Sequence, residues 1–141
     1  MASKRRRTAR EVALRALYEI EIGKQTPEDA VQHCLHDVVL DEDAKQFAHE
    51  LVSGVTTHKA EIDRRIEALS HEWALDRQAC VDRNVMRLAA YELMFCPGIP
   101  TAATINEAVE LVKKYSTKDS GRFVNGVLGA LADGLAKGGK V

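Results

Sequence analysis

The side chains best suited to bind a polyanion lie at the start of the chain. No acidic residue precedes Glu11, whereas the first ten residues carry five basic ones: Lys4, Arg5, Arg6, Arg7 and Arg10. Positive charge opposes the macrodipole at a helix N-terminus, so helix stability does not explain the cluster. Arginine presents a planar fork of donors that matches phosphate. The cluster predicts an arm that contacts RNA, with a solvated, disordered terminus as the alternative.

An aromatic residue follows the basic cluster on what reads as the same helix. Leu14, Tyr18 and Ile22 form a second apolar stripe, roughly opposite the main one, and Arg7 and Arg10 lie toward that side. An accessible aromatic ring beside arginine can stack on the bases of a single strand. The alternative is a tyrosine packed between helix layers, and self-association could also bury this stripe.

The sequence gives weaker evidence for a metal site or a catalytic site. His33, Cys34, His36 and His49 could be assembled into a metal site, but no cysteine pair accompanies them. Surface histidines are therefore favoured, and we expect neither a metal nor a cofactor. The sequence contains no G-x-S-x-G elbow and no H-E-x-x-H motif, so no enzyme is expected.

Charge and cysteine content restrict the class of protein. The 141 residues carry a formal net charge of −1, yet the 131 residues after Arg10 hold 15 basic and 21 acidic side chains, a balance of −6. A basic tip on an acidic body favours local contact with nucleic acid. Three cysteines without C-x-x-C spacing indicate free thiols in a reducing cytoplasm. No apolar run is long enough to span a membrane.

The apolar residues recur at helical spacing along the whole chain. This pattern predicts an all-α fold of about seven helices, which would position the residues described above. The first helix is expected from about Thr8 to Ile22, and another could run from Asp41 to Leu69 with a kink near Gly54. A strong helix is expected from about Ala79 to Phe95. Residues 70–76 form the expected junction between two small helical bundles packed together, which we place at residues 1–72 and 73–141.

Cap and glycine positions refine these elements. Thr26 followed by Pro27 predicts a helix start, and Thr104-x-x-Glu107 reads as a capping box. Asp119 or Ser120 is expected to cap the last helix. Glu92 falls on an apolar face and requires a partner, either Arg87 or a helix N-terminus. Three glycines inside the last helix predict a close approach of another helix: Gly126, Gly129 and Gly134.

Several segments together resemble the NusB family of transcription antitermination factors. Each segment alone is unspecific, but they occur in the order and spacing of the family across nearly the whole chain. The segments are residues 5–11 with 16–18, then 82–93, 105–111 and 123–128. The resemblance implies two helical bundles and no catalysis.

The resemblance also implies partners and contact residues. It implies binding to boxA RNA of ribosomal RNA leaders together with NusE, a small-subunit ribosomal protein. NusA, NusG and RNA polymerase would complete the assembly. The implied RNA contacts, besides the arginine-rich segment and Tyr18, are Asp119 and Phe123, although Phe123 also falls on the apolar side of its helix. Asp82 matches a position at the partner or RNA surface.

Two other functions remain open from the sequence. The same fold resembles the N-terminal, RNA-binding part of RNA cytosine methyltransferases, but the chain leaves no room for a cofactor-binding α/β domain. A helical protein–protein adaptor without an RNA role is the other alternative. The sequence does not distinguish a monomer from a homodimer.

Overall fold

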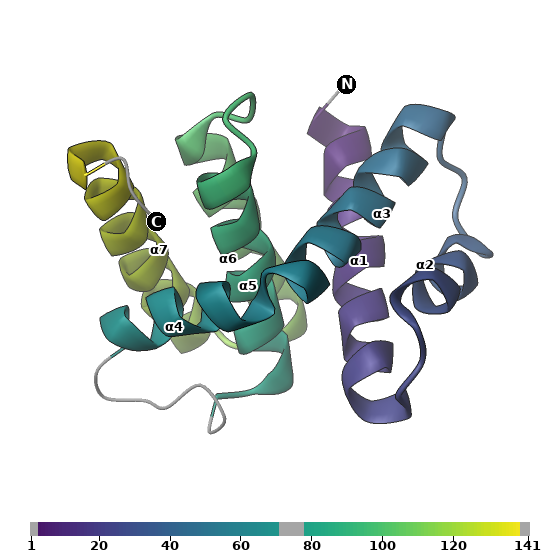
Figure 1. Cartoon of the computed structure of the whole chain (residues 1–141), viewed down its shortest axis with the longest axis horizontal. Coiled ribbons are helices and arrows are strands. Elements are labelled where there is room, and N and C mark those ends of the chain that lie inside the picture. Colours follow the sequence, from purple (N-terminus) through teal and green to yellow (C-terminus); the bar gives the residue numbers. More distant parts are fainter. Residues whose placement is uncertain (1–2, 71–77, 139–141) are drawn as a thin grey trace. The chain divides into compact units, whose positions relative to one another are not determined.

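The described part of the chain, residues 3–70 and 78–138 of a computed structural model, contains α-helices and no strands (Figure 1). The all-α prediction is confirmed. Apart from Ser70, the predicted junction lies outside the described residues. The helices within the described residues are α1 (Ser3–Gly23), α2 (Pro27–Leu35), α3 (Glu42–Thr57), α4 (Lys59–Leu69), α5 (Cys80–Phe95), α6 (Thr101–Tyr115) and α7 (Lys118–Gly138).

The helices group into two compact units, which we call the N-terminal unit (Met1–Thr57) and the C-terminal unit (His58–Val141). The division differs from the predicted boundary at residue 72, because α4 contacts α5 and α7 of the C-terminal unit. The predicted kink near Gly54 is also wrong. Gly54 lies buried inside α3, and the break comes at His58, between α3 and α4.

The N-terminal unit is built around α1, which contacts both α2 and α3. The predicted main face of α1 is buried, with Val12, Ala13 and Ala16 at most 1% exposed. Small alanine side chains on this face allow the neighbouring backbones to approach closely. The helix ends at Gly23, and Lys24 follows in the left-handed region with φ of 56°. Its N–H donates to the Ile20 carbonyl at 3.1 Å, which satisfies one of the last carbonyls of α1.

Side-chain caps start α2 and α3. The Thr26 hydroxyl accepts a hydrogen bond from the Asp29 N–H at 3.2 Å, with Pro27 in the first turn, so the predicted start of α2 is confirmed. At α3, Asp41 Oδ1 accepts from the Ala44 N–H at 2.9 Å. These bonds use N–H groups that lack partners within their own helix.

The predicted caps of α6 and α7 are wrong. Helix α6 begins at Thr101, so Thr104 lies inside the helix and does not form a capping box. Its hydroxyl instead donates to Glu92 Oε1 at 3.0 Å, which supplies the polar partner that the buried Glu92 requires. Helix α7 is capped by Thr117, whose hydroxyl accepts from the Ser120 N–H at 3.1 Å. Threonine is one of the residues preferred at the N-cap position.

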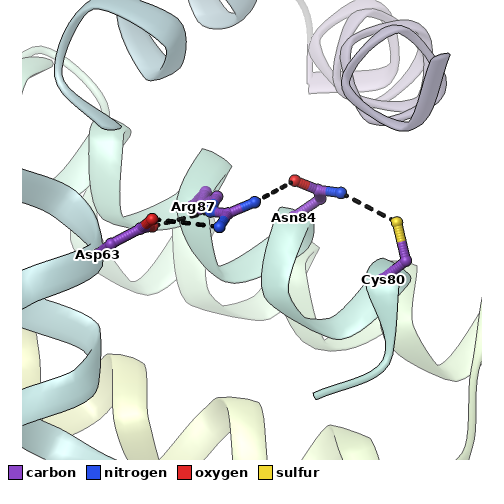
Figure 2. A network of polar contacts seen from close by, with 4 residues as sticks. All are labelled: Asp63, Cys80, Asn84 and Arg87. Atoms are coloured by element: carbon purple, nitrogen blue, oxygen red, sulfur yellow. Dashed lines mark hydrogen bonds and ion pairs between the residues drawn. The ribbon is translucent and has the colours of Figure 1, made fainter. Parts of the chain in front are cut away.

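In the C-terminal unit, α5 contacts α4, α6 and α7. A polar network fixes α5 to α4 (Figure 2). Arg87 donates through Nε and Nη2 to the two carboxylate oxygens of Asp63, at 2.8 and 3.1 Å. Its Nη1 donates to Asn84 Oδ1 at 3.0 Å, and Asn84 Nδ2 donates to Cys80 Sγ at 3.3 Å. The bidentate pair sets the orientation of the arginine as well as its position. Of the two partners that we expected for Glu92, Arg87 instead forms an ion pair with Asp63 of α4. The hydrogen bond to Glu92 comes from the Thr104 hydroxyl.

The glycines of α7 do not mark a close helix approach where we expected one. A Cβ atom added to Gly126, Gly129 or Gly134 would meet no neighbouring atom within 4 Å. A Cβ on Gly121 would lie 3.5 Å from Lys113 Cγ and 3.7 Å from Val109 Cγ1. Gly121, one turn into α7, therefore faces α6, but at distances that leave room for a Cβ.

Candidate nucleic-acid interface

The basic cluster belongs to α1 itself. Because α1 begins at Ser3, Lys4 to Arg7 occupy its first two turns, and the predicted separate arm is corrected. Lysine, arginine and alanine are strong helix formers, which offsets the unfavourable charge at this end. Lys4, Arg5 and Arg7 are exposed, and Arg6 is half-buried. The helix therefore presents these side chains from a regular backbone.

Arg5 is engaged by an acidic residue of the same unit. Its guanidinium forms an ion pair with Asp41, the residue that caps α3. The hydrogen bond from the Ala44 N–H, followed by Arg5, lowers the pKa of the Asp41 carboxyl below its ordinary value. Both side chains remain largely exposed, so a phosphate could compete with Asp41 for Arg5.

Arg10 has a different environment from the other basic residues. It is only 4% exposed, and its guanidinium carbon lies 5.7 Å from the centre of the Phe47 ring on α3. A cation over an aromatic face is attracted by the ring quadrupole. This contact gives Arg10 a packing role between α1 and α3, while its predicted role in binding RNA stays a prediction.

Tyr18 is accessible. Tyr18 has 47% of its surface exposed to solvent, and Ile22, one turn further on, has 60% exposed. The alternative of a tyrosine packed between helix layers is therefore excluded, although Leu14 of the same predicted stripe is buried. The exposed ring has the accessibility that base stacking requires.

Helical spacing places three of the predicted RNA contacts on one side of α1. Lys4, Arg7 and Tyr18 follow the i, i+3, i+14 pattern of a single stripe, which we call the α1 stripe. Eleven residues separate Arg7 from Tyr18, equivalent to about 16 Å along the helix axis. The α1 stripe thus pairs two cationic groups with an aromatic ring along one line.

The predicted residues of the C-terminal unit gather where α5 and α7 begin. Asp82 is 8% exposed, and its Oδ2 accepts a hydrogen bond from the Ser120 hydroxyl at 2.7 Å. Its other oxygen, Oδ1, is buried without a hydrogen-bond partner among the described residues. A buried carboxylate oxygen without a donor is costly. The predicted partner-binding role of Asp82 stays a prediction, and its buried carboxylate contacts the first turn of α7 through Ser120.

Asp119 and Phe123 flank this contact on α7. Asp119 is exposed in the first turn, and Phe123 is half-buried, so its ring is neither fully in the core nor free. The sequence did not point to Ser120 as a bonding partner of Asp82. The only available signal was the run of polar residues Thr117 to Ser120 before an apolar helix, which predicts a cap and not a contact with α5.

One group of possible metal ligands lies between α1 and α2. Glu19 Oε1 is 2.9 Å from His33 Nδ1, and Cys34 Sγ donates to Glu19 Oε2 at 3.4 Å. Burial, together with the hydrogen bond and the charge of Glu19, raises the pKa of the Cys34 thiol to about 11. His36 and His49, which we considered with them, line a separate surface pocket of about 430 Å³. Glu19 was not among the ligands considered from the sequence, because it lies fourteen residues before His33.

Among the described residues, no helix is both long enough and apolar enough to cross a membrane.

Comparison with known proteins gives consistent matches. The NusB family model matches residues 7–133. The transcription antitermination protein NusB of Myxococcus xanthus is 46% identical over 136 residues, covering 94% of this chain and 97% of that protein. A T. maritima NusB structure has a TM-score of 0.85 at 38% identity, covering 91% of this chain and 90% of that one. A structure of antitermination factors NusB and NusE in complex with dsRNA has a TM-score of 0.84 at 32% identity, covering 93% and 98%.

Proposed function

Because this chain belongs to the NusB family, we propose that it is a transcription antitermination factor that binds RNA together with NusE. The observation that carries the proposal is the similarity, over nearly the whole chain, to a NusB that was solved with NusE and RNA. Within this assignment the chain acts by binding and not by catalysis.

The α1 stripe supports the RNA-binding part of the proposal. Lys4 and Arg7 are exposed cations and Tyr18 is an exposed ring on the same side of one helix. Phosphate contacts fix the register of a strand but read no sequence, whereas stacking holds an unpaired base. Arg5 and Arg6 add cationic charge on neighbouring sides of the same turns. We assign Arg10 a supporting role, since it holds the helix against Phe47.

The start of α7 supports a second contact region. Asp119 is anionic and would repel phosphate, so it would act by accepting a hydrogen bond from a base or a sugar hydroxyl. Phe123 keeps part of its ring accessible. Asp82, linked to Ser120 beneath this surface, would help to orient the first turn of α7 for a contact with NusE or RNA.

The finer parts of the proposal follow from the family. The RNA would be boxA of ribosomal RNA operons, and the larger assembly would include NusA, NusG and RNA polymerase in the cytoplasm. A homodimer that buries Tyr18 and Ile22 would compete with RNA for the same side of α1. RNA binding should therefore shift such a dimer toward monomer by mass action.

Fluorescence anisotropy of labelled RNA tests the proposed function. The chain is titrated into boxA RNA and into a scrambled RNA of equal composition, with and without NusE, at two salt concentrations. We expect modest affinity for the chain alone and tighter, more boxA-selective binding for the pair, because base contacts specify sequence and phosphate contacts do not. Equal affinity and selectivity with and without NusE would contradict joint recognition. No RNA binding in either case would contradict the function itself.

A further inference from the structure

We propose that Glu19, His33 and Cys34 form a binding site for a zinc-like divalent cation that links α1 to α2. The site is independent of the RNA-binding function. It uses one oxygen, one nitrogen and one sulfur ligand, all within 4.8 Å of one another.

The distances between the ligand atoms fit a tetrahedral ion. With Zn–O and Zn–N bonds of about 2.0 Å and a Zn–S bond of about 2.3 Å, tetrahedral angles give separations of about 3.3 Å for N···O and about 3.5 Å for S···O. In this chain Glu19 Oε2 lies 3.1 Å from His33 Nδ1 and 3.4 Å from Cys34 Sγ. Both separations are within about 0.2 Å of the tetrahedral values.

Burial and charge also suit a bound cation. Cys34 is fully buried, the Glu19 side chain is 21% exposed and the His33 side chain is 66% exposed. The site is therefore closed on the sulfur side and open to solvent at the histidine, where water would complete a four-coordinate ion. A thiolate and a carboxylate would neutralise a divalent cation. On binding, the thiol proton now shared with Glu19 leaves to solvent, and a metal–sulfur bond forms. Arg15 adds nearby positive charge, which the two anionic ligands outweigh.

The site joins two helices of the N-terminal unit that contact each other. Glu19 lies near the end of α1, and the other two ligands are consecutive residues of α2. Any ion bound by the folded unit and not by the unfolded chain must stabilise the folded unit. The competing interpretation is a hydrogen-bonded triad that binds no metal. The two differ in whether the sulfur becomes a metal-bound thiolate.

Cobalt(II) is the spectroscopic probe for this difference. The full chain is treated with a chelator, kept reduced and titrated with Co²⁺, and the complex is then competed with Zn²⁺. We expect one equivalent to bind, with a thiolate-to-cobalt charge-transfer band and the intense visible bands of tetrahedral Co²⁺. Zinc should displace the cobalt, because it generally binds such N, O and S ligands more tightly. Thermal unfolding should move to higher temperature with one equivalent of Zn²⁺.

Variants assign the ligands. Cys34→Ser should abolish the charge-transfer band, and His33→Ala and Glu19→Gln should each weaken binding about tenfold or more. Cys80→Ser and Cys96→Ser, at the other two cysteines that form no disulfide, and His36→Ala next to α2 serve as matched controls that should leave binding unchanged. If Cys34→Ser fails to fold, the exposed His33→Ala decides the question, with circular dichroism as the check on folding.

Three results would overturn the proposal. The first is the absence of any cobalt band at a tenfold molar excess, about the level at which a folded three-ligand site should be filled. The second is a charge-transfer band that persists in Cys34→Ser, or an affinity for Co²⁺ that is unchanged in His33→Ala. The third is binding that disappears in a control variant, which would move the metal to another place.

Discussion

At the scale of single residues, the basic side chains that open the chain are not equivalent. Arg10 is buried against Phe47, Arg5 pairs with Asp41, and Lys4 and Arg7 remain exposed on the α1 stripe. A phosphate must displace Asp41 to bind Arg5, whereas Lys4 and Arg7 present exposed cationic groups. Affinity for RNA should therefore depend unequally on these residues.

Replacement of Tyr18 tests the stacking part of this account. We expect Tyr18→Ala to lose about 1–3 kcal/mol of RNA-binding free energy with little change in salt dependence, because a neutral ring contributes stacking and not counterion release. Tyr18→Phe keeps the ring and should retain most of the affinity. Anisotropy titrations measure both. A fall in melting temperature with unchanged RNA affinity would show instead that Tyr18 serves the fold.

At the scale of elements, polar contacts at the first turns of the helices position the candidate interface. Asp41 both caps α3 and pairs with Arg5 of α1, so one carboxylate links the first turns of two helices. Thr117 does the equivalent for α7 by receiving the Ser120 N–H, while the Ser120 hydroxyl reaches Asp82. These polar contacts fix the ends of helices, and apolar packing fixes their middles.

The Asp41 contact predicts a pH dependence. Its folded pKa is lowered, so its contribution to stability is present above the ordinary value of 3.8 and is lost as the pH falls through the folded pKa. Asp41→Ala should lower the melting temperature at neutral pH, and Asp41→Asn, which retains a cap but no charge, should lower it less. Urea unfolding from about pH 6 to about pH 3 should show the difference from the parent shrinking on acidification. A difference that stays constant over this range would contradict the lowered pKa of Asp41.

The open surface around Gly126 gives a second prediction at this scale. Gly126→Ala should raise the free energy of unfolding by about 0.5–1 kcal/mol, because alanine has less unfolded-state freedom to lose and its Cβ meets no neighbour. Gly121→Ala is the comparison, since its Cβ would make ordinary van der Waals contact with Lys113 and Val109 and should give a gain at least as large. Urea denaturation compares the two. A destabilised Gly126→Ala would contradict the open environment.

The sequence predicted what depends on local chemistry. The all-α fold, the buried face of α1 and the Thr26–Pro27 start of α2 were predicted, because apolar period and cap chemistry are local signals. The caps of α6 and α7 were not. Thr104 fits a capping box by spacing, but the need of buried Glu92 for a partner is a tertiary effect that no local pattern contains.

The prediction about the glycines was wrong, and the grouping of Glu19 with His33 and Cys34 was not foreseen, for a related reason. We predicted helix contacts at three glycines of α7: Gly126, Gly129 and Gly134. Whether another helix occupies the space beside a glycine depends on the tertiary structure, and here that space is open. Glu19 lies on a different helix from His33 and Cys34, so sequence spacing could not join them. For the candidate RNA contacts, the residue types could be chosen from the sequence. Which of them are accessible could not, since Arg10 is buried and Tyr18 is exposed.

At the scale of the whole molecule, charge is distributed unequally along the chain. Residues 1–10 carry five positive charges, and the rest of the chain carries a balance of −6. The acidic remainder repels a polyanion, which restricts productive encounters to the basic start of α1. Most of the electrostatic part of RNA binding should therefore come from a few residues in the first two turns of this helix.

The salt dependence of RNA binding by the variant with Arg5, Arg6 and Arg7 replaced by alanine tests this central claim most directly. Each lost phosphate contact should reduce the slope of log affinity against log salt concentration by about 0.7 on single strands. Helical content, checked by circular dichroism, should hardly change, and Arg64→Ala, an exposed arginine on α4, should keep the parent slope. A clearly flatter slope in the triple variant is the predicted result. A slope equal to that of the parent chain would contradict the assignment of α1 as the RNA-contacting helix.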